Sequence, residues 1–97
     1  MNPWKLKLSQ IRVLLAVAEH GNFSEAALQL DVTQSTVSHA IATLEHELGV
    51  VLFHRGRHGA KLTPLGEQIL PDARQIQALL ANIATAAVHE RGGDGGT

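Results

Sequence analysis

Two amphipathic segments separated by only three residues constrain the fold of this chain more than any other feature. Residues 24–30 predict a short helix with Ser24 as its N-cap, and residues 34–48 predict a longer helix with Thr33 as its N-cap. Only residues 31–33 remain for the connection. Two helices joined by so short a turn must cross steeply, so the pair predicts a helix-turn-helix.

The second helix of this pair has an apolar face and an uncharged outer face. Its apolar residues stay within roughly 60° of arc when each residue turns about 100°, so they are expected to face the core. These residues are Val37, Ile41, Leu44 and Leu48. The opposite face is short and polar, and it consists of Ser35, Ser38, His39, Ala42, Thr43 and His46. A face without long charged side chains permits close approach to another surface.

A further helix is expected before this pair. It begins with Ser9 as its N-cap and ends at Gly21, a residue suited to the left-handed position that closes a helix. Its apolar stripe has the i, i+3, i+4, i+7 spacing of a helix that packs on one side. The stripe comprises Ile11, Leu14, Leu15 and Ala18. The three helices together predict a small helical core.

The chain after the third helix changes to a pattern typical of strands. Residues 50–53, with the sequence VVLF, show the β-branched and aromatic bias of a strand. Residues 60–62 are expected to form the antiparallel return strand. Gly56 and Gly59 can supply the turn between the two strands. The hairpin is therefore expected to form the wing of a winged helix-turn-helix.

A last, long helix is expected to start at Thr63 and Pro64, as an N-cap followed by proline in the first turn. Its apolar residues alternate at intervals of four and three, which is the pattern of a coiled-coil seam. The seam consists of Leu65, Ile69, Ala73, Ile76, Leu80, Ile83 and Ala87. Pro71 removes one backbone donor and predicts a kink. Packing on its own domain is an alternative, but the helix should outrun so small a core at about 1.5 Å per residue. The stripe is therefore expected to pack against a partner.

The length of 97 residues corresponds to a single small core. The predicted fold class is mainly α. Residues 1–63 are expected to form a winged helix-turn-helix with a three-helix core and a two-stranded wing. Residues 64–90 are expected to form a linker and dimerisation helix, and residues 91–97 a flexible glycine-rich tail. The absence of cysteine excludes disulfides and thiolate metal sites. No apolar run is long enough to cross a membrane, and the amino terminus lacks the apolar segment of a secretion signal, so a cytoplasmic protein is expected.

The charges are unevenly distributed along the chain. A formal net charge of −1 argues weakly against nucleic-acid binding, because phosphate contacts need Lys and Arg. Residues 54–61, however, hold Arg55, Arg57 and Lys61 without any acid. The expected wing therefore carries a local basic patch.

These elements together predict binding to double-stranded DNA. A helix that enters a major groove about 12 Å wide must bring donors and acceptors to the base edges. Gln34 can make a bidentate contact to adenine, and the methyl group of Thr36 suits a thymine methyl group. Ser35 and Ser38 can bond bases or phosphates. The arginines of the wing are expected to contact the backbone or a narrow minor groove.

Several separately spaced motifs resemble one family. They are AVAEHGNFSEAALQL, VTQSTVSHAIATLEHELG, LFHR and LTPLGEQIL, which occur in this order between Leu8 and Ile76. With these residues the sequence resembles the DNA-binding domain of LysR-type transcriptional regulators. The resemblance implies sequence-specific binding to an interrupted inverted repeat in a promoter, by a homodimer that pairs through the last helix.

The resemblance also assigns roles to individual residues. It implies recognition-helix contacts by Gln34, Ser35, Ser38 and His39, positions near the backbone for Thr33 and Thr36, and a wing contact by Arg55. Arg57 is added to these DNA-binding residues because of its place in the hairpin. Two residues depart from the family pattern: His39 stands where arginine or another long polar residue is frequent, and His58 occupies a wing position often filled by arginine.

The resemblance further implies a C-terminal domain that senses a small metabolite. No such segment follows the last helix in this sequence, so the chain resembles an isolated or truncated DNA-binding portion that ends in its linker. Neither a cofactor nor a small-molecule ligand is expected in it.

The residues alone leave other interpretations open. The uncharged helix face also suits a protein–protein surface, and the wing arginines are also consistent with solvated charge. His54 and His58 are four residues apart, but Gly56 interrupts helical alignment and no carboxylate completes a metal site. An enzyme is disfavoured because no nucleophile with a base and no paired carboxylates occur at usable spacing. Trp4 is expected to bury its ring against the last helix of this chain or of a partner, and base stacking is the alternative role for it.

Overall fold

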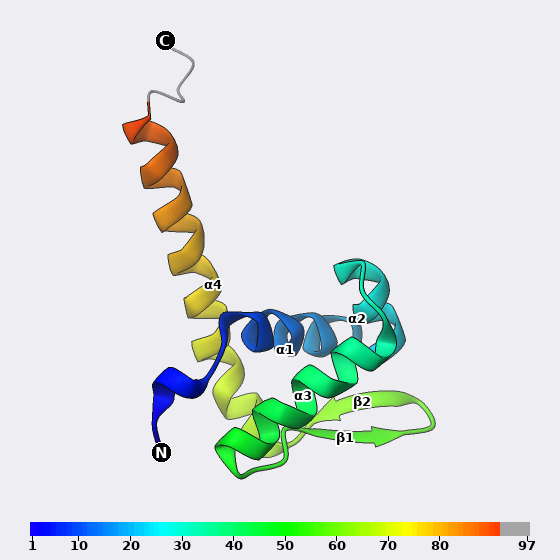
Figure 1. The fold of residues 1–97 in the computed structure, drawn as a ribbon. Coiled ribbons are helices and arrows are strands. Elements are labelled where there is room, and N and C mark those ends of the chain that lie inside the picture. Colours follow the sequence, from blue (N-terminus) through cyan, green and yellow to red (C-terminus); the bar gives the residue numbers. More distant parts are fainter. Residues whose placement is uncertain (92–97) are drawn as a thin grey trace.

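The computed structural model describes residues 1–91, which form four α-helices, one 3₁₀ helix and a two-stranded sheet. The elements in chain order are η1 (Pro3–Lys5), α1 (Leu8–His20), α2 (Phe23–Leu30), α3 (Gln34–Leu48), β1 (Phe53–Gly56), β2 (Gly59–Leu62) and α4 (Pro64–Glu90). Figure 1 shows α1, α2 and α3 grouped together, with the hairpin beside them and α4 rising away from the group. This arrangement confirms the predicted winged helix-turn-helix with a long final helix.

Helix α1 begins before the predicted residue. Ser9 lies inside it, and Lys7 is the N-cap. The backbone N–H of Lys7 donates to Oε1 of Gln10 at 2.8 Å, so the first turn is held by a residue of the helix itself. Gly21 ends α1 in the left-handed conformation, at φ 73°, as predicted.

The buried face of α1 is displaced from the predicted stripe. Leu14 is fully buried as expected, but the other three predicted residues are half-buried. The residues that join Leu14 in the core are Val13, Ala16 and Val17. The face is displaced because α1 is covered from more than one side, by α2 and α3 and also by α4 and β2.

Helix α2 also begins before the predicted residue. Its N-cap is Asn22, whose Oδ1 accepts a hydrogen bond from the Glu25 N–H at 2.8 Å, so Ser24 is not the cap. Starting at this position puts Phe23 in the core, where its ring packs edge-on against Phe53 with the ring centres 6.1 Å apart. The helix ends at Leu30 as predicted.

Helix α3 follows the sequence pattern closely. Oγ1 of Thr33 accepts a hydrogen bond from the Thr36 N–H at 3.1 Å, which confirms the predicted N-cap. Gly49 closes the helix at φ 71°. Three of the four predicted core residues, Val37, Ile41 and Leu44, are fully buried. Leu48 is only half-buried, because the last turn lies at the margin of the core.

The first strand begins later than the sequence suggests. The Glu45 carboxylate accepts hydrogen bonds from the backbone N–H groups of Leu52, at 2.7 Å, and Phe53, at 3.2 Å. These contacts tie Leu52 and Phe53 to α3, and the ladder with β2 starts only at Phe53, opposite Leu62. The prediction of a strand over 50–53 was therefore wrong, whereas the return strand at 60–62 is confirmed within β2.

Helix α4 has two parts with different surroundings. Thr63 caps it as predicted, with Oγ1 accepting from the Gly66 N–H at 3.0 Å. Within the predicted seam, Ala73 is 1% exposed and three neighbours are half-buried, so this part packs on the chain's own core. Those neighbours are Leu65, Ile69 and Ile76.

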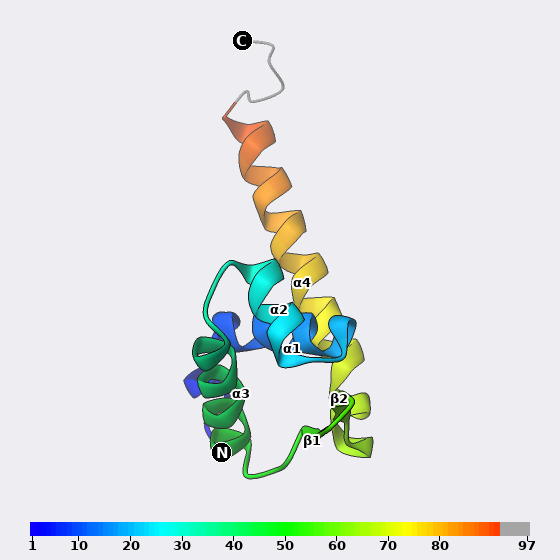
Figure 2. The same cartoon turned by 90° about the vertical axis from the view of Figure 1, so that its right-hand side faces the viewer.

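The outer part of α4 projects beyond the core, as Figure 2 shows from the side. There Leu80 is 43% exposed, Ile83 is 67% exposed, and Ala87 is also exposed. The seam is thus divided between an internal contact and a free apolar stripe. The helix continues through Pro71. The division of the chain at residues 63 and 64 stays a prediction, and the predicted tail lies outside the described residues except for Arg91.

Candidate nucleic-acid interface

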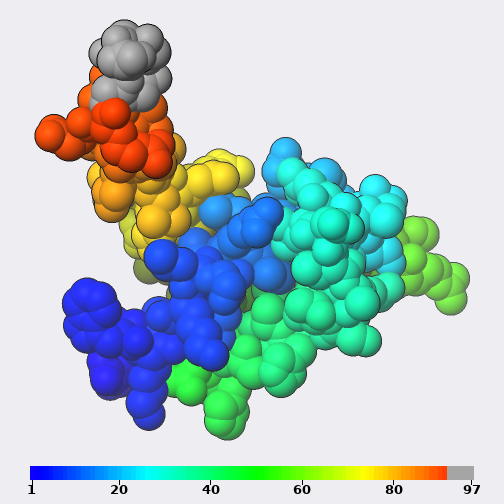
Figure 3. Space-filling view, turned by 45° about the horizontal axis from the view of Figure 1, so that its top comes forward, coloured from blue at the N-terminus to red at the C-terminus, as the bar shows by residue number. Residues whose placement is uncertain are grey.

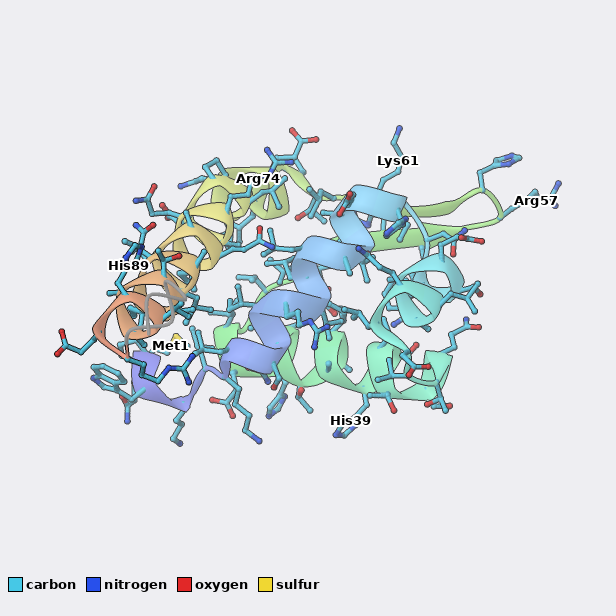
Figure 4. The ribbon with its side chains drawn as sticks, turned by 90° about the horizontal axis from the view of Figure 1, so that it is seen from above. Met1, His39, Arg57, Lys61, Arg74 and His89 are labelled. Carbon is cyan, nitrogen blue, oxygen red and sulfur yellow. The ribbon has the colours of Figure 1, made fainter. Side chains whose placement is uncertain are left out.

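The outward face of α3 is polar, short and accessible. Ser35, Thr36 and His39 are exposed, while Ser38 is half-buried beside them. At about 100° per residue, Ser35 and His39 lie almost opposite the buried Val37 stripe. Figure 4 shows His39 projecting from α3 away from the rest of the molecule. The helix therefore presents the face that the sequence predicts.

A groove separates the start of α3 from the wing. Its lining comes from the start of α2, the first residue of α3 and the hairpin, and comprises Asn22, Phe23, Ser24, Gln34, Arg55, Gly56, Arg57, His58 and Gly59. Two arginines in one polar groove provide permanent positive charge beside the helix. We call this the wing groove. It brings the predicted residues Gln34, Arg55 and Arg57 together.

The two wing arginines are held differently. The guanidinium carbon of Arg55 lies 3.9 Å from the centre of the Phe23 ring, within cation–π distance. Arg57 lies in the turn of the hairpin, and Figure 4 shows it at the far end of the wing. Lys61, in contrast, lies on the side opposite His39 in the same view, so it does not share this surface. The basic patch expected over 54–61 is thus divided.

The wing itself is fastened to the turn between α1 and α2. The Ala60 N–H donates to the Gly21 carbonyl oxygen at 2.8 Å. Gly59, at φ 116°, passes so close to that carbonyl that a Cβ atom there would collide with it. The close approach fixes the position of the hairpin relative to the helices.

A second groove lies along α3 on the side of the amino-terminal segment. It is lined by Lys5, Lys7, Ser9, Gln10, Ser35, Thr36, His39, Ala40, Thr43 and Glu47. We call this the amino-terminal groove. Figure 3 shows the amino-terminal segment on one side of the molecule and the wing tip projecting on the other. The exposed face of α3 thus has two lysines at one margin and two arginines at the other.

Sequence reasoning missed Lys5 and Lys7 as candidate binding residues. No local pattern in the first nine residues indicates which part of the chain they approach. The connection is made by Gln10, which is 5% exposed and whose Nε2 donates to Oγ1 of Thr43 at 3.1 Å. This contact joins the start of α1 to the middle of α3 and places the lysines beside the helix.

Among residues 1–91, no group of three or more His, Asp or Glu side chains is arranged to hold a metal ion. Within the same residues, no helix is sufficiently long and apolar to span a membrane.

Comparison with known proteins identifies the family. The family model described as bacterial regulatory helix-turn-helix protein, lysR family, matches residues 8–67. The probable transcriptional regulator LrrA of Synechococcus elongatus is 50% identical over 91 residues, which cover 94% of this chain and 31% of LrrA. The transcriptional regulator ClcR of Pseudomonas putida is 42% identical over 71 residues, or 73% of this chain and 24% of ClcR. The chain thus spans about a third or less of the length of these relatives.

Solved structures resemble the whole arrangement. The CbnR DNA-binding domain in complex with DNA superposes with a TM-score of 0.81 at 35% identity, covering 88% of this chain and 98% of that one. The BenM DNA-binding domain, solved with benA site 1 DNA, gives 0.80 at 30% identity, covering 86% and 96%. The match of sequence and fold over most of the described residues shows that this chain belongs to the LysR family of bacterial regulatory helix-turn-helix proteins.

Proposed function

We propose that this chain is the DNA-reading part of a transcriptional regulator and binds double-stranded DNA in a sequence-specific manner. The observation that supports this most directly is the uncharged outer face of α3 between two grooves that each carry two cations. Short side chains let the helix approach base edges in a major groove, while cations at both margins meet phosphates. The DNA complexes of CbnR and BenM support the same reading for a domain of this shape.

The proposed roles follow from position. Ser35 and His39, on the outermost face of α3, contact base edges, and Gln34 and Ser38 do so at the wing side. Thr33 and Thr36 lie at the start of α3, where backbone N–H groups favour a phosphate. Arg55 and Arg57 contact the backbone or the adjacent minor groove. Lys5 and Lys7 bind the backbone at the opposite margin.

We also propose that the chain pairs with a second copy through the outer part of α4. Four large apolar side chains there are exposed, namely Leu79, Leu80, Ile83 and Val88. Next to them lies an apolar groove between α1 and α4 that includes Leu8, Ile11, Leu15, Ile76 and Leu80. A helix placed in this groove would cover Leu80 and, one turn further along the same face, Ile83. Two copies related by a twofold axis would read an inverted repeat.

The wider assignment rests on the family. LysR-type relatives are named as transcriptional regulators and not as enzymes. We propose that the chain acts on chromosomal DNA in the bacterial cytoplasm, and that control by a small metabolite, if the complete regulator has it, resides outside the residues that bind DNA.

The decisive experiment is a titration of a DNA fragment with a twofold-symmetric site, compared with random DNA of equal length. We expect a preference for the symmetric fragment and an affinity that falls steeply with salt, with a slope near −0.9 for each phosphate neutralised. Equal affinity for both fragments, without salt dependence, would exclude the proposal.

A helical module that binds only proteins is the competing function, because it would share the apolar α4. The wing distinguishes the two. Exchanging Arg55 and Arg57 for alanine leaves pairing through α4 intact in both cases, but it weakens DNA binding only in a DNA-binding domain.

A further inference from the structure

We propose that Ser24 holds the amide group of Gln34 so that Gln34 reads the two acceptors of guanine and not the donor–acceptor edge of adenine. This inference rests on the proposed DNA binding and specifies the base that the wing side of α3 selects. The Ser24 hydroxyl donates to Oε1 of Gln34 at 2.9 Å. The two residues belong to different helices, α2 and α3, which are joined by a turn of three residues.

Neither residue is needed to cap its helix. Asn22 accepts the hydrogen bond at the start of α2, and Thr33 does so at the start of α3. The Ser24 hydroxyl is therefore free to orient a neighbour. Both side chains are exposed and both line the wing groove, next to the arginines that are proposed to bind the backbone. The pair lies where a base edge would be read.

The chemistry of the amide decides which base fits. A glutamine side chain has one acceptor oxygen, Oε1, with two lone pairs, and two N–H donors on Nε2. Adenine presents an acceptor at N7 and a donor at N6 in the major groove, so a bidentate contact uses both ends of the amide. Guanine presents two acceptors, N7 and O6.

The contact with Ser24 affects the adenine and guanine contacts of Gln34 differently. The Ser24 hydroxyl occupies one of the two lone pairs of Oε1, so an adenine N6–H group can use only the remaining one. The two guanine acceptors meet the two N–H groups of Nε2 without that competition. Ser24 thus acts as a positioning residue, and it makes the sequence-based expectation of an adenine contact the less favourable one.

The test is a selection of bound sequences from a random DNA pool by the complete chain and three variants. For the unaltered chain we expect guanine at one position of each half-site, and for Gln34→Ala we expect loss of that preference. Ser24→Ala should shift the ratio of guanine to adenine at this position by about three- to tenfold toward adenine, the size of one hydrogen bond. Ser24→Thr retains the hydroxyl and should keep guanine.

A chemical probe on the DNA side tests the same contact. Replacing the selected guanine with 7-deazaguanine removes N7 and should weaken binding of the unaltered chain severalfold, but not that of Gln34→Ala. Both substituted side chains are exposed, so folding is expected to be unaffected, and thermal melting checks this.

Three results would overturn the inference. One is selection of adenine by the unaltered chain, and another is an unchanged base ratio for Ser24→Ala. The third is an equal loss of affinity on all sequences for either alanine variant, which would mean that the residue contacts only phosphate. Failure of the unaltered chain to select any sequence would instead reject the proposed function itself.

Discussion

The guanidinium carbon of Arg55 lies 3.9 Å above the ring of Phe23, so a residue of the wing is held by the first residue of α2. This contact restricts a side chain that would otherwise move freely at the margin of the DNA-binding face. The same ring packs on Phe53 at the base of β1. Phe23 therefore contacts the wing at two residues, the ring of Phe53 and the guanidinium group of Arg55.

The effects of Phe23 and Arg55 on DNA affinity are expected to be coupled. Phe23→Leu keeps an apolar side chain in the core but removes the ring face, so Arg55→Ala should weaken DNA binding less in that background. We expect a coupling of about 0.5–1 kcal/mol from a double-mutant cycle of dissociation constants. Arg57→Ala, which has no such contact with Phe23, is the control and should be additive. If the effects of Phe23→Leu and Arg55→Ala on the binding free energy were additive, the contact between the two side chains would not contribute to DNA binding.

The amino-terminal lysines are expected to contribute to affinity on all DNA sequences. Replacing Lys5 and Lys7 with alanine removes two cations from the amino-terminal groove and should reduce the magnitude of the salt slope of binding by about one to two units. Binding measured by fluorescence anisotropy over a range of salt concentrations gives this slope.

The matched control for the lysines is Arg74→Ala. Arg74 lies on α4, on the side of the molecule opposite His39 in Figure 4, so its removal changes the net charge without changing either groove. If this variant lowered the slope as much as loss of the lysines, net charge and not the groove would determine the effect.

Charge on the exposed stripe of α4 should separate a dimer. Ile83 is 67% exposed and lies outside the residues that line the apolar groove, so Ile83→Asp is not expected to alter the fold of the single chain. It should weaken association by at least tenfold, because a buried unpaired carboxylate is costly at an apolar seam. Sedimentation equilibrium measures the change.

Thr85→Asp provides the control for this experiment. At about 100° per residue Thr85 lies almost opposite the stripe, and it is exposed as well. If Ile83→Asp left association as unchanged as Thr85→Asp, the outer part of α4 would not belong to the dimer interface.

The wing glycines are expected to differ in their effect on stability. A Cβ at Gly59 would meet the Gly21 carbonyl oxygen, and φ there is 116°, so Gly59→Ala should lower the free energy of unfolding by about 1–3 kcal/mol. Gly56 has open space around it and an ordinary φ, so Gly56→Ala should change it by less than about 0.5 kcal/mol. Chemical denaturation compares the two. Equal effects would mean that the hairpin does not rely on the close approach to α1.

Local signals in the sequence were sufficient for α3 and for most helix ends. Thr33, Gly21 and Gly49 act within one turn of the residues they cap, so their roles can be predicted from neighbours in the chain. The start of α2 could not be chosen in this way. Asn22 and Ser24 are both good N-caps, and the choice depends on placing Phe23 against Phe53, a residue thirty positions away.

The sequence indicated the candidate residues on α3 and in the wing, but it did not indicate those of the amino-terminal segment. The outer face of α3 follows from helical periodicity. Lys5 and Lys7 reach it only through the contact of Gln10 with Thr43, which no spacing rule indicates. The delayed start of β1 has a similar cause, because the Glu45 side chain occupies backbone donors that a strand would use.

Helix α4 is one continuous helix from Pro64 to Glu90, whose inner turns are embedded beside α1 and whose outer turns stand free. The direction in which the outer apolar stripe points is therefore fixed by how Ala73 is seated in the core. Adding a single residue between these parts would rotate the stripe by about 100° about the axis of the helix. In any dimer that pairs through that stripe, the number of residues along α4 therefore determines the rotation of one DNA-binding domain relative to the other.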